Sequence, residues 1–388
     1  MALTLEFERA LQAVVPSVSI PYFDFTLEST FYDAGDFRSS GVFAPSWFGD
    51  AAPLNTLRTV TAGRWAFVPT MADARGFSRW TNSYGLLRAP WNNDPTPFST
   101  RSDKVYGYRN NLKPSGCAEY ARALAQTSWV GLARQLNSAA HGHIHELIGG
   151  SWDHDYSKNM THDSRLHPAV FTFAHQIQAL SKLLWRAGVV ECPAACDLSA
   201  DASQACACTC GTATSASPYA TLRDAGVLAA AQFFDADEKL IASFVGEDGT
   251  STEYRLPNYS AAESEEIYAA LLAILCVPGH IGDMYQATST NDVLFWVLHP
   301  TLDRLWHYKR LVANSSSFDA AWPHDAAACY GHNPSDKQPF KWLFGDDPEP
   351  LENVELVRRF DPKSAALAYA YDRFEWTHCR AAGRAVGG

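Results

Sequence analysis

The chain has 388 residues and a formal net charge of −11, with 31 Lys and Arg against 42 Asp and Glu. This acidic balance, without any basic run, argues against a nucleic-acid or anionic-membrane partner, because both need a basic surface that neutralises phosphates. With 47% hydrophobic residues and no apolar run of the roughly 18 residues that a membrane span needs, the sequence predicts a globular protein of at most two domains.

The N-terminal part of the chain is predicted to be one helix followed by loops. Apolar residues recur at helical spacing between residues 3 and 14, and Pro16 ends the pattern. From 30 to 115 the sequence is rich in Gly, Pro, Asn, Asp and aromatic residues without a sustained period, which is typical of a long ordered loop region. The N-terminus shows no signal peptide, and we expect it to correspond to the middle of a longer protein.

Further helices are predicted wherever apolar residues recur at helical spacing. They cover residues 118–129, 130–148, 170–184, 261–274 and 289–311. Gly149-Gly150 is a strong stop signal for the second of them. The stretch 212–262, rich in Ala, Ser, Thr and Gly, is predicted to hold only short helical pieces.

The helix that ends at Gly149 carries a candidate metal site. His141 and His145 are four residues apart, so both lie on one helix face, about 6 Å apart at Cβ, and can reach one ion. His299, on the last of these helices, is the best candidate for a third ligand. His143 lies about 200° around the helix from His141 and is expected to be structural or to support a ligand.

The histidines of this sequence also allow other interpretations. Three structural histidines are the simplest alternative, but three residues that fit two spaced motifs favour a metal site. A zinc-protease motif is excluded, because Gly142 and not Glu follows His141. His167, His175 and His280 are weaker ligand candidates, since eight residues separate the first two, about 12 Å along a helix. The remaining histidines are expected to bond to carbonyls or to lie at the surface: His154, His162, His307, His324, His332 and His378.

The nine cysteines are many for a reduced cytosolic protein, and five of them lie between residues 192 and 210. Their Cys-x-Cys-x-Cys spacing could bind zinc or copper(I), but the Ser, Ala, Asp and Pro around them favour a disulfide-pinned loop. The cysteine content and three glycosylation sequons, at Asn159, Asn258 and Asn314, favour a secreted or secretory-pathway protein. The runs that begin at Cys329 and end at Cys379 suggest a small, partly β-structured tail, which a disulfide between these two would close.

Several segments resemble the tyrosinases and related type-3 copper proteins, among them catechol oxidases and hemocyanins. His141-x3-His145 with Ile148-Gly-Gly resembles the second copper motif of that family, and Phe295-Trp-Val-Leu-His299 resembles the segment that supplies its third histidine. Asp303-Arg304-Leu-Trp306, which completes that segment, is expected to contain a pair, Asp303 with Arg304, that orients helices or a ligand. Further similar segments are Phe7–Gln12, Ile20–Thr26, Gly85-Leu-Leu-Arg88 and Tyr369-Ala-Tyr371.

The resemblance implies a four-helix bundle that holds two copper ions, each on three histidines, and oxidises phenolic small molecules to quinones with O2. Copper on His141, His145 and His299 would then be the catalytic metal, and Phe295 and Trp296 could shape a phenol pocket. Imidazole nitrogens suit copper, and apolar helix packing keeps water from the metal.

Two departures from the family pattern limit this expectation. The chain has no histidine before His141, so the three ligands of the first copper are absent, and we expect the chain to begin just after the last of them. Gly142 stands where the family often has an Asn that helps to activate a phenol. Oxidation of o-diphenols is therefore better supported than hydroxylation of monophenols. The alternatives are a catalytically inactive, tyrosinase-like protein with a structural or single-metal role, and a mononuclear copper or zinc hydrolase.

The fold class that follows is mainly α: a type-3 copper helix bundle with long ordered loops, a cysteine-rich insertion and a small C-terminal β-containing tail. Residues 1–311 would form the copper-binding domain, with the insertion at about 151–280. Residues 312–388 would form the tail that completes its core.

Overall fold

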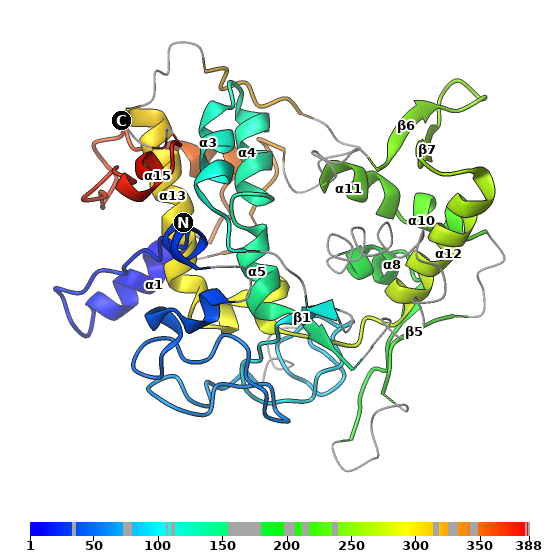
Figure 1. Ribbon diagram of the computed structural model, residues 1–388, viewed down its shortest axis with the longest axis horizontal. Helices are drawn as coiled ribbons and strands as arrows, with labels where there is room; N and C mark the ends of the chain where they lie inside the picture. Colours follow the sequence, from blue (N-terminus) through cyan, green and yellow to red (C-terminus); the bar gives the residue numbers. More distant parts are fainter. Residues whose placement is uncertain are drawn as a thin grey trace. The chain divides into compact units, whose positions relative to one another are not determined.

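The fold is mainly helical in the computed structural model, as the sequence predicts (Figure 1). The chain forms two compact units, each built from separate stretches of sequence. The first comprises Met1–Ser40, Leu112–Ile144 and Val293–Gly388, and the second comprises Gly41–Asn111 and His145–Asp292. The structure describes residues 1–32, 36–72, 80–105, 108–109, 113–153, 180–197, 206–211, 217–234, 240–312, 318–324, 333–338, 340–341, 348–384 and 386.

The described part of the first unit is built from helices joined by loops (Figure 1). Its helices are α1 (Ala2–Gln12), α2 (Thr26–Phe31), the 3₁₀ helix η1 (Asp36–Ser39), α3 (Cys117–Ala125), α4 (Trp129–Asn137), α13 (Phe295–Leu311), α14 (Asn353–Arg359) and α15 (Thr377–Ala381). Helix α5 (Gly142–Gly149) begins in this unit and continues into the second.

Helix α13 is buried along most of its length and packs against α1 and α3. Leu298 and Leu305, seven residues apart, are fully buried on one face, which is the helical spacing expected of a core helix. At its N-terminal end the ring of Trp296 stacks on Phe7 of α1, with centroids 4.0 Å apart. Burial along this face stabilises α13 although Pro300 lies inside it and removes one backbone donor.

Polar residues of α13 fasten the C-terminal tail of the same unit. One carboxylate oxygen of Asp303 accepts hydrogen bonds from the hydroxyls of Tyr369, at 2.7 Å, and Tyr371, at 2.9 Å. Arg304 donates to the carboxylate of Asp24 at 3.1 Å. The predicted pairing of Asp303 with Arg304 is therefore replaced by separate partners. The tail supplies tyrosine hydroxyls as donors to Asp303, and Asp24 is the carboxylate that accepts from Arg304.

A disulfide between Cys117 and Cys379 links α3 to α15, across 262 residues of sequence. The predicted bond between Cys329 and Cys379 is therefore wrong. Cys379 is fully buried in the middle of α15, where it is bonded to Cys117 of α3. Cys329 itself lies outside the described residues.

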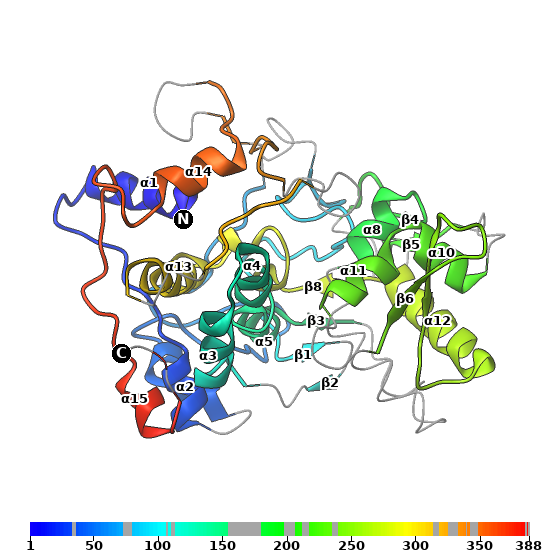
Figure 2. The ribbon, with the colours of Figure 1, turned by 90° about the horizontal axis from the view of Figure 1, so that it is seen from above.

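The second unit combines long loops, short helices and two-stranded sheets (Figure 2). The four sheets are antiparallel pairs: β1 (Lys104–Val105) with β2 (Tyr108–Arg109), β3 (Ser151–Trp152) with β8 (His280–Ile281), β4 (Val190–Glu191) with β5 (Thr209–Cys210), and β6 (Ala242–Val245) with β7 (Thr252–Arg255). The helices are η2 (Gly41–Phe43), α8 (Ser181–Arg186), α10 (Pro218–Asp224), α11 (Val227–Phe234), α12 (Ala261–Cys276), η5 (Asp283–Tyr285) and η6 (Ser289–Asn291).

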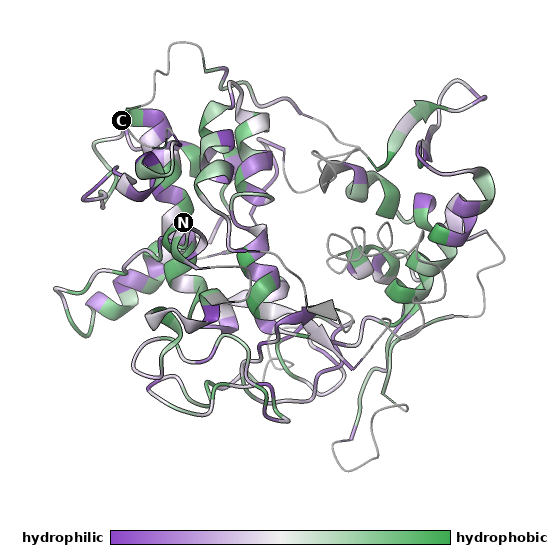
Figure 3. Ribbon diagram, in the orientation of Figure 1, coloured by the Kyte–Doolittle hydropathy of each residue, from purple (hydrophilic) through white to green (hydrophobic). Residues whose placement is uncertain are grey.

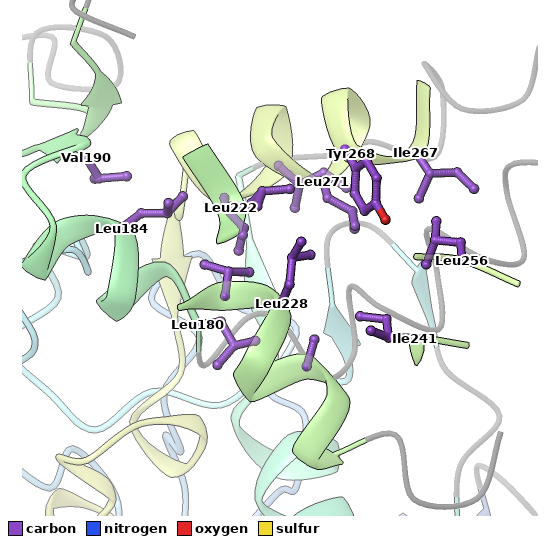
Figure 4. Packing of buried hydrophobic residues seen from close by; sticks show 14 of the residues in the cluster. Leu180, Leu184, Val190, Leu222, Leu228, Ile241, Leu256, Ile267, Tyr268 and Leu271 are labelled. Carbon is purple, nitrogen blue, oxygen red and sulfur yellow. The ribbon is translucent and has the colours of Figure 1, made fainter. Parts of the chain in front are cut away.

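A hydrophobic core of this unit lies among α8, α10, α11 and α12. The side chains of Leu184, Leu222, Leu228 and Leu271, each at most 1% exposed, point toward one another (Figure 4). Helix α11 is apolar over most of its surface, which fits its place in this core (Figure 3). Ser260 caps α12: its hydroxyl accepts from the Glu263 amide, and the Glu263 carboxylate accepts in turn from the Ser260 amide, at 2.9 Å.

Three disulfides pin the cysteine-rich part of the second unit. They join Cys192 to Cys208, Cys196 to Cys206 and Cys210 to Cys276. The disulfide interpretation of this cluster is therefore confirmed, and the metal interpretation of its five cysteines is wrong, because sulfurs in disulfides are not thiolate ligands.

Some predicted elements differ from the observed ones. The predicted helices 118–129 and 130–148 become three, α3, α4 and α5, and the predicted helix 170–184 lies largely outside the described residues. Residues 212–262 hold the β6–β7 hairpin besides short helices. The described tail shows β structure only as isolated bridges, Ser128 with Asp319 and Lys337 with Glu352. No described helix is long and apolar enough to cross a membrane.

Candidate metal centre

The structure brings together the three histidines that the sequence singled out. His141 directly precedes α5, His145 lies one turn later on that helix, and His299 lies in the second turn of α13. One ring nitrogen from each lies within 4.8 Å of the other two. The rings of His141 and His299 meet edge to face, with centroids 5.6 Å apart. Such a separation allows one ion to contact all three nitrogens.

Each of the three rings is held by a backbone carbonyl through its Nδ1 atom. The distances are 2.5 Å from His141 to the Leu136 oxygen, 2.6 Å from His145 to the Met284 oxygen, and 3.0 Å from His299 to the Phe295 oxygen. A carbonyl only accepts hydrogen bonds, so Nδ1 carries the proton in all three neutral rings. Nε2 is then the atom that offers a lone pair to a metal.

Burial lowers the pKa of His145 below its ordinary value, against the opposing effects of the Met284 carbonyl and the Asp292 carboxylate. A histidine whose pKa is lowered in the folded protein stays neutral to more acidic pH. Only a neutral imidazole binds a metal, so this environment favours ligation near neutral pH. The free energy of unfolding gains from the neutral His145 above the ordinary histidine pKa of about 6.5 and loses that gain as the pH falls below it.

Aromatic side chains surround the His299 end of the site. The ring of Phe295 lies against that of His299, with centroids 4.1 Å apart. Trp296 is edge-on to Phe295 at 5.2 Å and stacks on Phe7. Phe295 therefore limits the orientations that the His299 ring can adopt, whereas Trp296 anchors α13 to α1.

The other described histidines have different surroundings. His280 pairs with Asp153 at 2.6 Å, and His378 lies 2.7 Å from the Thr26 hydroxyl. His307 is buried beside Asp303, and burial lowers its pKa. His324 is exposed, and His143, half-buried, is outside the three-histidine group. The predicted candidates His154, His162, His167, His175 and His332 lie outside the described residues.

A second group of potential ligands, Cys117, His378 and Cys379, also has its donor atoms within 4.8 Å of one another. Its two sulfurs are bonded to each other, so they offer no thiolate to a metal. The three-histidine group is thus the metal-binding candidate among the described residues.

The residues present fit copper by their chemistry, since three neutral imidazoles suit both Cu(I) and Cu(II). The group offers three nitrogens, a set that could hold one ion. The site residue that sequence reasoning missed is Met284, whose contribution is a backbone oxygen. No side-chain pattern predicts such a contact, although Gly282, two residues before Met284, lies at a place of close backbone approach.

One comparison with known proteins found a match. Residues 2–175 match the common central domain of tyrosinase, a range that contains His141 and His145. No curated protein and no solved structure is similar enough to the chain to be matched. Residues 2–175, less than half of the chain, are therefore similar to the tyrosinase family of type-3 copper proteins.

Proposed function

We propose that this protein is a copper oxidoreductase of the tyrosinase class that oxidises o-diphenols to quinones with O2, and that His141, His145 and His299 hold its second copper. The observation that carries the proposal is the convergence of the three rings, each with Nδ1 bound to a backbone carbonyl. The family match supplies the reaction class.

In this proposal the chain's own residues bind the metal, orient the histidine rings and shield one side of the site from water. The three Nε2 atoms bind the metal, and the three carbonyls fix the tautomer and direction of each ring. Phe295 packs against His299 and keeps one side of the site apolar. Copper, when bound, supplies the electron exchange between phenol and oxygen. An o-diphenol that becomes an o-quinone loses two electrons and two protons, so reduction of one O2 to two waters consumes two diphenols.

One observation favours a second candidate function. The family reaction uses two coppers on six histidines, and the described residues form one three-histidine group. A chain that binds a single copper would be a tyrosinase-like protein with weak oxidase activity or none, and with a structural or metal-binding role. Gly142, in place of the family's Asn, also makes monophenol hydroxylation the less supported reaction.

Copper reconstitution tests the proposal. The purified chain is loaded with copper, the metal is counted, and oxygen uptake is measured with catechol. We expect one copper per chain from this site and loss of that copper in His145→Ala. The matched control is His143→Ala, on the same helix but outside the group, which should keep its copper.

The possible outcomes separate the alternatives. Absence of bound copper, or full retention of copper by His145→Ala, would overturn the ligand assignment. One copper without oxygen uptake would favour the single-metal protein, and metal-dependent hydrolysis without oxygen uptake would favour a hydrolase. Two coppers per chain would contradict the half-site and require further ligands.

We also propose that the protein passes through an oxidising compartment, as four disulfides suggest. The division into a copper-binding domain of residues 1–311, with an insertion at about 151–280, and a tail of 312–388 stays a prediction. Expression of residues 1–311 alone, followed by copper counting, would test whether the tail is needed.

A further inference from the structure

We propose that the buried ion pair between Arg88 and Asp283 is a positioning device for the metal ligand His145, acting through the carbonyl of Met284. The inference rests on the proposed copper site and names residues that determine the orientation of one of its ligands. All of the contacts that carry it lie within the second unit.

The first step links the ligand to the short helix η5. The Nδ1 atom of His145 lies 2.6 Å from the carbonyl oxygen of Met284, the middle residue of η5. The Met284 side chain is fully buried. The direction of the His145 ring therefore depends on where η5 holds that carbonyl.

The second step concerns Asp283, the neighbour of Met284 in the same turn. Its carboxylate is fully buried and accepts from Arg88 Nε at 3.2 Å and Arg88 Nη2 at 2.9 Å. It also accepts from the Thr100 amide at 3.0 Å and from Asn291 Nδ2 at 3.2 Å. The Asp283 amide in turn donates to the Thr100 carbonyl at 3.1 Å. Because several donors from different segments bind this one carboxylate, they restrict the movement of η5 relative to its neighbours.

The third step concerns what holds Arg88. Its guanidinium, itself fully buried, also donates to three backbone carbonyls of one loop, those of Asp94 at 3.2 Å, Thr96 at 2.6 Å and Phe98 at 2.7 Å. A planar guanidinium fixes the direction of every hydrogen bond that it donates, which a lysine cannot do. Arg88 thus joins η5 to a loop that would otherwise be held by few regular hydrogen bonds.

The fourth step is the close approach of η5 to the end of α5. The Gly282 amide donates to the Gly150 carbonyl at 3.1 Å. A Cβ at Gly149 would overlap the backbone of Tyr285, and a Cβ at Gly282 would overlap the carbonyl of Gly149. The two backbones touch because both positions are glycine, and this contact brings the Met284 oxygen within reach of His145, one turn earlier on α5.

Together these contacts form a chain from Arg88 through Asp283 and Met284 to His145. A group that hydrogen-bonds the ring nitrogen opposite the metal orients a metal-bound histidine. Altering such a group commonly weakens metal binding by about 10- to 100-fold. An ion pair that acted only on stability would change the melting temperature and leave the copper affinity of the folded protein unchanged.

The experiment compares three variants by copper(II) affinity, by the Cu(II) electron paramagnetic resonance spectrum and by thermal unfolding. Asp283→Asn keeps the size of the side chain and removes its charge, and Arg88→Lys keeps the charge and removes the fixed geometry. The control is Arg223→Lys, on α10 of the same unit, which alters the ion pair with Glu253 of β7, outside the turn that holds Met284. All affinities are measured well below the melting temperature of each variant.

We expect Asp283→Asn and Arg88→Lys to weaken copper binding by about 10-fold or more and to change the copper hyperfine coupling. Arg223→Lys should keep the affinity within about twofold, since its pair lies outside this chain of contacts. In a His145→Ala background, Asp283→Asn should cause no further loss, because its effect passes through His145.

The outcomes distinguish this inference from the function on which it rests. If His145→Ala keeps full copper binding, the proposed site fails and the inference with it. If His145→Ala loses copper while folded Asp283→Asn and Arg88→Lys bind like the wild type, the site stands and the positioning role is overturned. If Asp283→Asn does not fold, Arg88→Lys and the milder Asn291→Ala decide in the same way.

Discussion

The two units use different means to hold polar residues and loops in place. In the first, helix α13 meets a tail through tyrosine hydroxyls on Asp303, and one disulfide joins segments 262 residues apart. In the second, Arg88 and Arg101 are buried against aspartates, and three disulfides close rings of 16, 10 and 66 residues.

The difference follows from secondary structure. The helices of the first unit satisfy their own backbone groups, so the tail needs only a few anchors. The described loops of residues 41–72 and 80–103 contain few regular hydrogen bonds, and buried arginines satisfy several of their carbonyls instead. The backbone position of His145 is therefore fixed by helix α5, whereas the position of the Met284 carbonyl that orients its ring depends on the ion pair of Asp283 with Arg88.

The largest expected effect tests the long-range disulfide. Replacing Cys117 and Cys379 by Ser should lower the free energy of unfolding by about 5 kcal/mol, because the bond closes a very long loop in the unfolded chain. The same change at Cys196 and Cys206, which close a much shorter ring, should cost less. Denaturant unfolding measures both. A larger loss from the shorter ring would contradict the loop-length account.

A second test addresses the close approach in the second unit. Gly282→Ala should lower the free energy of unfolding by about 3 kcal/mol, because the new Cβ overlaps the Gly149 carbonyl. Gly226→Ala is the control: its φ is +77°, but a Cβ there meets nothing within 4 Å. We expect it to cost about 1 kcal/mol from backbone strain alone. Equal losses in thermal unfolding would remove the packing argument.

A third test concerns the hydroxyls that fasten the tail to α13. Tyr371→Phe removes one hydrogen bond to the Asp303 carboxylate and should cost about 2 kcal/mol of unfolding free energy. Tyr308→Phe, on α13 itself and without a bond to Asp303, should cost less. Urea unfolding followed by tryptophan fluorescence reports both. An unchanged midpoint for Tyr371→Phe would show that the tail is held mainly by its rings.

The smallest effect is expected at the cap of α12, in the second unit. Ser260→Ala removes the hydroxyl that accepts from the Glu263 amide and should cost about 1 kcal/mol. Ser260→Asp, which preserves a capping oxygen, should lose much less. If the two variants melted at the same temperature, the cap would add nothing to the stability of that core.

Much of the candidate site was predictable, because its residues follow helical spacing. His141 and His145 share a face by the geometry of any helix, and the apolar spacing around His299 marks a buried helix. The disulfide state of the cysteine cluster was also predictable from its composition. The role of these histidines as copper ligands stays a prediction.

Other features were beyond sequence reasoning for physical reasons. Spacing does not fix which cysteines pair, so the partner of Cys379 could be found only from the fold. The Met284 carbonyl is a backbone group. Every residue carries such a group, so only the conformation of the chain determines which carbonyl contacts His145. The β6–β7 hairpin, in contrast, carried a usable signal: Asp248-Gly249 between two short runs of β-forming residues.

The bond between Cys117 and Cys379 also constrains how the protein can be made. A chain emerges from the ribosome N-terminus first, and domains fold as their residues appear. Every segment of the second unit lies between residues 41 and 292, so that unit can fold while synthesis continues. The first unit folds later: α13 follows the second unit in the sequence, and the disulfide of the first unit can form only after Cys379 has been synthesised. Cys117 therefore cannot form its native bond until the 262 residues that follow it have been synthesised.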